Sequence, residues 1–242
     1  GVSMYPRTTR FTFLFMLTVS ALLAACNSQP PAPASTPAPA PPQPIAAEDR
    51  VKWYQDCWNL FSKHQWAEFK NCYSPTASAD QVSYGLPAQN GSDALVAAAQ
   101  QFVQGFPDMA GEGQLILVNG SHVTGVYLLK GTNDGPMPGL GGKETPATKK
   151  KIGLLFAHAV DVEETANRIT REWGVMDNGS MAFQLGLSKN PGRPLMASGE
   201  ASPKIVFAKN DETERKNLET EKTQIAAWNM HDAAAADAFN ND

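Results

Sequence analysis

The period of the hydrophobic pattern changes near residue 108, and this change restricts the possible folds more than any other feature of the chain. Before it, apolar residues in 47–64 and 93–106 recur every three or four positions, as on one face of a helix. After it, residues 151–162 and 168–176 have the alternation of strands. Helices followed by antiparallel strands predict an α+β domain, with the helices packed on one face of a curved sheet.

Local signals place the ends of these elements. We expect one helix over 47–64, a short second helix over 65–73, and a third helix that Ser92 caps and Pro107 stops. The run "QLILV", Asn119-Gly120 and "SHVTGVYLLKG" then predicts a hairpin with a tight type I′ turn. The last two strands are joined around "EETAN" at residues 163–167.

The first 45 residues are not expected to belong to the folded domain. Arg7 and Arg10 precede an apolar run shorter than the roughly 20 residues that span a bilayer, so residues 1–26 are interpreted as an export signal. The end of this segment, "LAAC", resembles the bacterial lipobox, in which Cys26 would be acylated. An ordinary signal peptide with an A-x-A-like cleavage site is the alternative. The Pro/Ala-rich residues 27–45 predict a semi-stiff tether, which gives a lipid-anchored envelope protein on the periplasmic or cell-surface side.

The C-terminal quarter contains a possible repeat. Residues 46–190 form the predicted domain, and residues 191–210, with three prolines, are interpreted as a linker. The following "AAWNMHDAAAADAF" echoes "CWNLFSKHQWAEF" near the start of the domain. We expect residues 211–242 to begin a second, truncated copy of the domain. The alternative is a solvated C-terminal helix that packs on the first domain.

Composition excludes several classes of function. The 242 residues carry a net charge of −4 and no aromatic-plus-basic motif, which argues against nucleic acid as a partner. The cysteines and histidines lack zinc-ligand spacing and HExxH is absent from the sequence, so no metal is expected. The glycine run "GLGGKE" has Glu144 where a phosphate-binding loop needs Ser or Thr after the lysine.

Cys57 and Cys72 remain once Cys26 is assigned to the lipobox. Two cysteines in an oxidising envelope are typical of a structural bridge. The predicted helical hairpin over 47–73 would bring them towards each other. Closing a loop of about 15 residues corresponds to about 3 kcal/mol in the chain-entropy model. We therefore expect a disulfide between Cys57 and Cys72.

Five short motifs occur in a fixed order and together resemble one family. They are "FPDM" at 106–109, "GTNDG" at 131–135, "PATKKK" at 146–151, then "REWGVMD" and "QLGL". In this order they resemble the SnoaL-like polyketide cyclases, or ester cyclases, of the nuclear transport factor two-like superfamily. The resemblance implies a cone-shaped antiparallel sheet that three N-terminal helices close, an interior pocket, and no cofactor.

The resemblance also implies site residues. In these cyclases an aspartate at the "W...D" position is the general acid and base of an aldol ring closure, which here is Asp177. Strict alternation places Trp173 and Asp177 on one apolar face of their strand. A carboxyl in an apolar cone would have a raised pKa and could accept and return a proton. His158, on the face that carries Phe156, would polarise the substrate carbonyl.

Asn133 stands where family members commonly carry a histidine, and we expect it, with Trp173 and Phe156, to contact the substrate. His158 could instead be a satisfied core histidine, and Asp177 could simply cap the turn "DNGS". Two functions therefore stay open. One is a cofactor-independent cyclase or isomerase of a small hydrophobic carbonyl compound. The other is a non-catalytic module that binds an apolar ligand or pairs with a partner domain, as a homodimer or between tandem copies.

Overall fold

The computed structural model describes residues 42–80, 88–138 and 144–238. The predicted export signal, Cys26 and most of the tether lie outside the described residues, as do residues 139–143 of the glycine run. Within the described ranges, no helix combines the length and the apolar character needed to cross a membrane.

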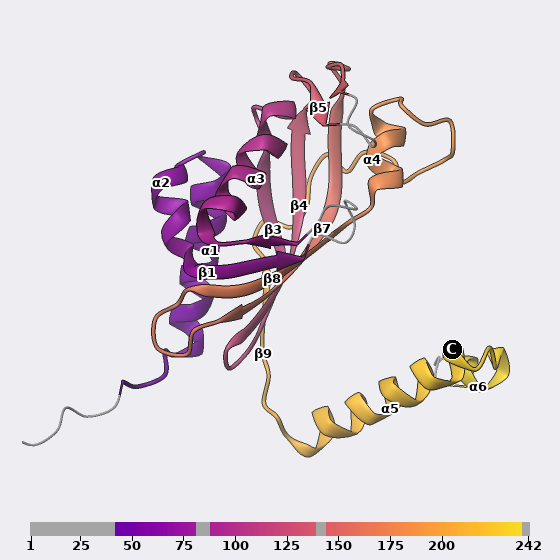
Figure 1. Cartoon of the computed structure of the whole chain (residues 1–242). Coiled ribbons are helices and arrows are strands. Elements are labelled where there is room, and N and C mark those ends of the chain that lie inside the picture. Colours follow the sequence, from indigo (N-terminus) through magenta and orange to yellow (C-terminus); the bar gives the residue numbers. More distant parts are fainter. Residues whose placement is uncertain (1–41, 81–87, 139–143, 239–242) are drawn as a thin grey trace, which may run out of the picture. The chain divides into compact units, whose positions relative to one another are not determined.

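Three helices precede most of the sheet and lie on one side of it (Figure 1). They are α1 (Ala47–Ser62), α2 (Trp66–Phe69), which continues into a 3-10 turn over Lys70–Cys72, and α3 (Ser92–Gly105). Tyr54, Cys57 and Phe61 recur along the buried face of α1, as the periodicity of the sequence predicts. The predicted order of helices is confirmed, and α3 ends just before Phe106 and Pro107. The prediction that Ser92 caps α3 is wrong, because Gly91 is the N-cap residue and Ser92 is the first residue of the helix.

Seven strands form one sheet in the order β2-β1-β8-β7-β4-β3-β9. The pairs β1–β8 and β3–β9 are parallel, and the other neighbours are antiparallel. A separate short ribbon pairs β5 with β6. The mixed α+β fold with a curved sheet is confirmed. The strands are β1 (Tyr73–Asp80), β2 (Gln89–Asn90), β3 (Ala110–Asn119), β4 (His122–Thr132), β5 (Met137–Pro138), β6 (Glu144–Thr145), β7 (Lys151–Val162), β8 (Ile169–Met176) and β9 (Lys204–Phe207).

The central hairpin has the predicted position but a shifted turn. Asn119 pairs with His122, so the two turn residues are Gly120 and Ser121. Gly120 has a φ of 56°, the left-handed conformation that glycine adopts without steric cost. The Asn-Gly signal therefore locates the hairpin correctly, although Asn119 is the last residue of β3.

Five strands of the described chain were not expected from the sequence, and of these only β1 and β9 are longer than two residues. β1 contains Pro75 and several small polar residues, a composition with little strand preference. β9 lies inside residues 191–210, the segment interpreted as a linker, and it pairs with β3. Both strands depend on a partner that is distant in the sequence, so local patterns do not reveal them.

A β-bulge in β8 reverses the predicted orientation of its side chains. Val162 of β7 pairs with Ile169, but the preceding Asp161 pairs with Arg171, so Thr170 is an extra residue in β8. An extra residue exchanges the two faces of a strand. After the bulge, Glu172 is buried and Asp177 is exposed. The prediction that Asp177 faces the interior is therefore wrong.

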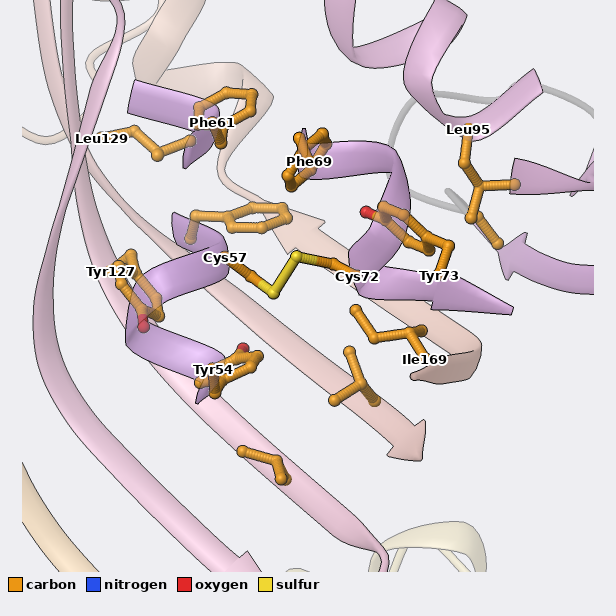
Figure 2. Packing of buried hydrophobic residues seen from close by; sticks show 14 of the residues in the cluster. Tyr54, Cys57, Phe61, Phe69, Cys72, Tyr73, Leu95, Tyr127, Leu129 and Ile169 are labelled. Atoms are coloured by element: carbon orange, nitrogen blue, oxygen red, sulfur yellow. A yellow bond between two sulfur atoms is a disulfide. The ribbon is translucent and has the colours of Figure 1, made fainter. Parts of the chain in front are cut away.

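The predicted disulfide is present. Cys57 on α1 and Cys72 at the end of the 3-10 turn are bonded, with a Cα–Cα distance of 6.1 Å. Figure 2 shows the bridge inside the cluster of buried hydrophobic residues, between α1 and the start of β1. Three further helices complete the described chain: α4 (Asn178–Gln184), α5 (Glu212–Asn229) and α6 (Ala233–Asp237).

Candidate active site

A cavity of about 160 Å³ lies between the three N-terminal helices and the sheet. An engineered apolar cavity of about 150 Å³ is large enough to bind benzene, so this cavity has room for one small ring. Most of its lining is aromatic or aliphatic, and the polar side chains come from few positions. The lining residues are Tyr54, Cys57, Trp58, Phe61, Phe69, Tyr73, Ala79, Gln89, Leu95, Ala98, Ala99, Phe102, Leu129, Phe156, His158, Ile169 and Glu172.

Four of these polar side chains form one hydrogen-bonded network. Nε2 of His158 on β7 lies 3.1 Å from Oε2 of Glu172 on β8. The hydroxyl of Tyr54 on α1 lies 2.8 Å from Nδ1 of His158. The hydroxyl of Tyr73 on β1 donates to Oε2 of Glu172 over 3.0 Å. Since His158 is 7% exposed and Glu172 is 6% exposed, the network is almost sealed from bulk water.

The contacts of His158 restrict the position of its proton. The Tyr54 hydroxyl lies near both Nδ1 and, at 3.1 Å, the carbonyl oxygen of His158 itself. A hydroxyl has one proton, so Tyr54 either donates to Nδ1 or accepts from it while donating to the carbonyl. With Glu172 ionised, both arrangements need a proton on Nε2 that is donated to Oε2. In either case, one hydrogen bond from Nε2 of His158 to Oε2 of Glu172 joins the two side chains.

Burial keeps the two tyrosines protonated. Desolvation raises the pKa of Tyr54 and of Tyr73, and the nearby charge of Glu172 raises both further. Both hydroxyls are therefore hydrogen-bond donors across the neutral range. The contacts of Tyr73 and His158 with Glu172 are both made to Oε2 of the carboxylate.

Aromatic neighbours set the orientation of the imidazole. The rings of Tyr54 and Phe156 stack on His158 with centroid distances of 5.8 Å and 5.7 Å, and Trp58 meets it edge to face at 5.5 Å. Rings packed in this way allow the imidazole little freedom to rotate. The arrangement holds an acid-base pair in a fixed geometry at the wall of an apolar cavity.

Two of the five predicted site residues line the cavity, and three do not: Trp173, Asn133 and Asp177. His158 and Phe156 line it, as expected from their shared strand face. Trp173 lies on the opposite face of β8, where the guanidinium of Arg171 is 4.4 Å from the centroid of its ring. Asn133 is fully buried and joins loops: it donates to the carbonyls of Gly105 and Gly135 and accepts from Thr148.

Asp177 lies at the end of β8, outside the cavity. It caps α4, accepting from the Ser180 amide over 2.9 Å and from the Ser180 hydroxyl over 2.6 Å. These hydrogen bonds lower the pKa of Asp177. The expectation of a raised pKa is wrong, and the turn-capping alternative describes what the structure shows.

Three residues of the network were not identified from the sequence. Glu172 was missed because strict alternation assigns it to the outer face of β8, whereas the bulge at Thr170 turns it inwards. Tyr54 lies in the helix predicted over residues 47–64, but no partner was predicted for its hydroxyl. Tyr73 directly follows Cys72. Its position next to a predicted disulfide is the one feature of the sequence that could have drawn attention to it.

Comparison with known proteins identifies the family. The model of the SnoaL-like polyketide cyclases matches residues 48–185. The chain belongs to this family. A search among curated proteins finds no match.

TsrD, a solved structure, is similar to this chain in fold. TsrD from Streptomyces laurentii is 15% identical, with a TM-score of 0.51, and the match covers 60% of this chain and 99% of TsrD. IdmH from Streptomyces antibioticus is 20% identical, with a TM-score of 0.48, and the match covers 57% of this chain and 98% of IdmH. At 15% identity the likeness to TsrD extends to the fold alone.

Proposed function

We propose that this protein is a cofactor-independent cyclase or isomerase that acts on a small hydrophobic carbonyl compound. One observation carries the proposal: the His158–Glu172 pair lies at the wall of an otherwise largely apolar cavity, with a tyrosine hydroxyl on each partner. A basic and an acidic side chain that contact each other at the wall of a cleft are candidates for proton transfer to and from a bound substrate. The pair replaces Asp177 as the acid-base candidate.

The proposed reaction moves one proton and rearranges bonds within the substrate. The Glu172 carboxylate removes a proton from the carbon next to the carbonyl, and the electrons of the broken C–H bond pass to the carbonyl oxygen. In a cyclase the resulting enolate carbon attacks a second carbonyl of the same molecule, and the new alkoxide takes the proton back. In an isomerase the proton returns at a different carbon. Neither route changes the oxidation state of the substrate as a whole, so no redox cofactor takes part.

The shared first step gives a test that does not require the natural substrate. Acetophenone and cyclohexanone each combine one ring with a carbonyl, and both lose α-hydrogens on enolisation. In D₂O, proton NMR should show that the protein accelerates deuterium incorporation at these positions above the buffer rate. Incorporation at the buffer rate for both ketones would contradict enolisation at this site and favour the binding module.

A second candidate, a module that pairs with a tandem copy of itself, is favoured by a structural repeat. In the α1–α2 and α5–α6 turns a histidine has a positive φ, 56° at His64 and 57° at His231. Its amide donates over 2.9 Å to the carbonyl of Phe61 or of Trp228, three residues earlier in each case. The next amide donates to the carbonyl five residues earlier in both turns. The two hairpins thus share one local design.

Three apolar positions of α1 also coincide with apolar positions of α5, although Tyr54 and Cys57 fall opposite Glu221 and Gln224. With the two histidines aligned, Leu218, Ile225 and Trp228 of α5 fall at the positions of Val51, Trp58 and Phe61, which pack in the core. On α5 the three side chains are 54%, 51% and 65% exposed. This agreement supports the proposal that residues 211–242 begin a second SnoaL-like copy. In that copy the exposed apolar side chains of α5 would pack against the copy's own sheet.

Matched substitutions separate this proposal from a helix that packs on the first domain. Leu218→Ser should leave the thermal unfolding of the first domain unchanged, because Leu218 would not contribute to its core. Val51→Ser, at the equivalent position of α1, should lower the melting temperature clearly. A comparable loss of stability in Leu218→Ser would contradict the second copy and support packing on the first domain.

The N-terminal segment supports a proposal about location. The lipobox-like "LAAC" and the Pro/Ala-rich residues after it favour acylation of Cys26 and a tether to the cell envelope. Radiolabelled palmitate should label the wild type and not Cys26→Ser. Equal labelling of both would contradict the lipid anchor.

A further inference from the structure

The disulfide joins the two segments that carry the tyrosines of the site. Tyr54 lies one helical turn before Cys57 on α1, and Tyr73 directly follows Cys72 at the start of β1. Figure 2 shows Tyr54 and Tyr73 on either side of the bridge. Cys57 itself lines the cavity. The bridge is therefore part of the wall of the site.

The contacts close into a ring. Starting from the bridge, α1 leads to Tyr54, whose hydroxyl contacts Nδ1 of His158 at 2.8 Å. His158 contacts Glu172 at 3.1 Å, and Glu172 accepts from Tyr73 at 3.0 Å. Tyr73 then returns through the backbone to Cys72 and the bridge. Three hydrogen-bonded contacts and one covalent cross-link thus hold the same four side chains.

Backbone pairing gives Tyr73 little support of its own. Tyr73 pairs with Ile169, but the next pair along β1 is Ser78 with Arg171. Between them the ladder is irregular, and Pro75 has no backbone N–H to donate. The ladder therefore does not continue through the residues that follow Tyr73, whereas the bridge anchors the residue immediately before it.

We infer that the Cys57–Cys72 disulfide is a positioning device for the acid-base site, which is fully assembled only in the oxidised protein. Reduction should release the start of β1 from α1 and separate Tyr73 from Glu172. The effect on catalysis rests on the proposed function, but the effect on the network does not. Cys57 and Cys72 take no part in the proton transfer themselves. They affect it only by holding Tyr54 and Tyr73 in position.

NMR can observe the network directly. In the oxidised protein, the Tyr73 hydroxyl proton and the Nε2 proton of His158 should exchange slowly with water and give resolved signals. Both signals should disappear when the bridge is reduced with a phosphine, or in Cys57→Ala/Cys72→Val, while circular dichroism still shows a folded protein. Persistence of both signals in either folded, bridge-free protein would overturn the inference.

A stability control separates positioning from general support of the fold. Ile116→Ala truncates a fully buried residue of β3 that is outside the network. It should lower the melting temperature and keep both proton signals. If the bridge-free proteins do not fold at all, the bridge supports the whole domain and the positioning role is wrong.

The catalytic consequence is measured separately. Reduction should lower the rate of deuterium incorporation into acetophenone at least tenfold, whereas Ile116→Ala should retain most of it. If the proton signals vanish on reduction while the oxidised protein never catalyses incorporation, the positioning role stands and the proposed function fails. If the oxidised protein catalyses incorporation and reduction changes neither the proton signals nor the rate, the positioning role is wrong and the proposed function stands.

Discussion

Two carboxylates lie near each other in sequence at β8 and have opposite environments. Glu172 is 6% exposed and accepts hydrogen bonds from His158 and Tyr73 inside the cavity. Asp177 is exposed and accepts from the amide and hydroxyl of Ser180 at the start of α4. Environment, more than residue type, decides what an acid does in a protein. Here it assigns Glu172 to the site and Asp177 to the capping of a helix.

One backbone irregularity produces this difference. Thr170 is the extra residue of the bulge opposite Asp161 and Val162, and it exchanges the faces of every residue that follows it in β8. Bulges occur frequently next to active sites, where they redirect a side chain. The bulge also explains why Arg171 and Trp173 meet each other on the outer face.

The largest expected effect compares the two acids by activity. Glu172→Gln should lower the rate of α-deuterium incorporation into acetophenone by about 10²–10⁴-fold, the usual contribution of a general base. Asp177→Asn should leave the rate unchanged, because Asn caps a helix about as well as Asp. Proton NMR in D₂O measures both, and the near-UV circular dichroism of each variant checks that it is folded. A lower rate for Asp177→Asn than for Glu172→Gln would contradict the assignment of Glu172 as the general base.

A smaller effect compares them by stability. Glu172→Ala leaves the Tyr73 hydroxyl and Nε2 of His158 buried without their acceptor, at a cost of about 1–3 kcal/mol for each group. Asp177→Ala removes a helix cap and should cost about 1 kcal/mol. Urea unfolding of both variants at neutral pH gives the two values. An equal cost would mean that the Glu172 network stabilises no more than the exposed cap does.

The smallest effect concerns acid pH. Hydrogen bonds from Ser180 lower the pKa of Asp177, so the folded state favours its ionised form. The stabilisation is fully present above the unfolded value of about 3.9 and is lost as pH falls through the lower folded value. The stability advantage of the wild type over Asp177→Asn should therefore shrink below pH of about 4. An advantage that grew on acidification would imply a raised pKa.

The sequence predicted the local features of the fold and missed the non-local ones. Amphipathic spacing located α1 and α3, and the turn signals located the β3–β4 hairpin, because both depend on neighbouring residues. Cys57 and Cys72 were paired correctly because the predicted helical hairpin brings them together. β1 and β9 depend on distant partners, and no local pattern marks them.

Of the four network residues, only His158 was predicted from the sequence, together with Phe156 of the cavity wall. Alternation along β7 is uninterrupted, so His158 and Phe156 were placed on the cavity face. The same rule failed on β8, since nothing in "RITREW" marks Thr170 as a bulge. The prediction that Asn133 contacts the substrate is wrong for a different reason: its buried amide joins the end of α3 to two loops, and no sequence motif indicates this role.

The most direct test of the site is a crystal structure of the oxidised protein with acetophenone bound. We expect the ring in the cavity between Trp58 and Phe156, with its methyl carbon within about 3.5 Å of a Glu172 oxygen, the separation of a reactive geometry. A ketone bound beside Asp177, or bound in the cavity with its carbonyl directed away from Glu172 and His158, would contradict this expectation.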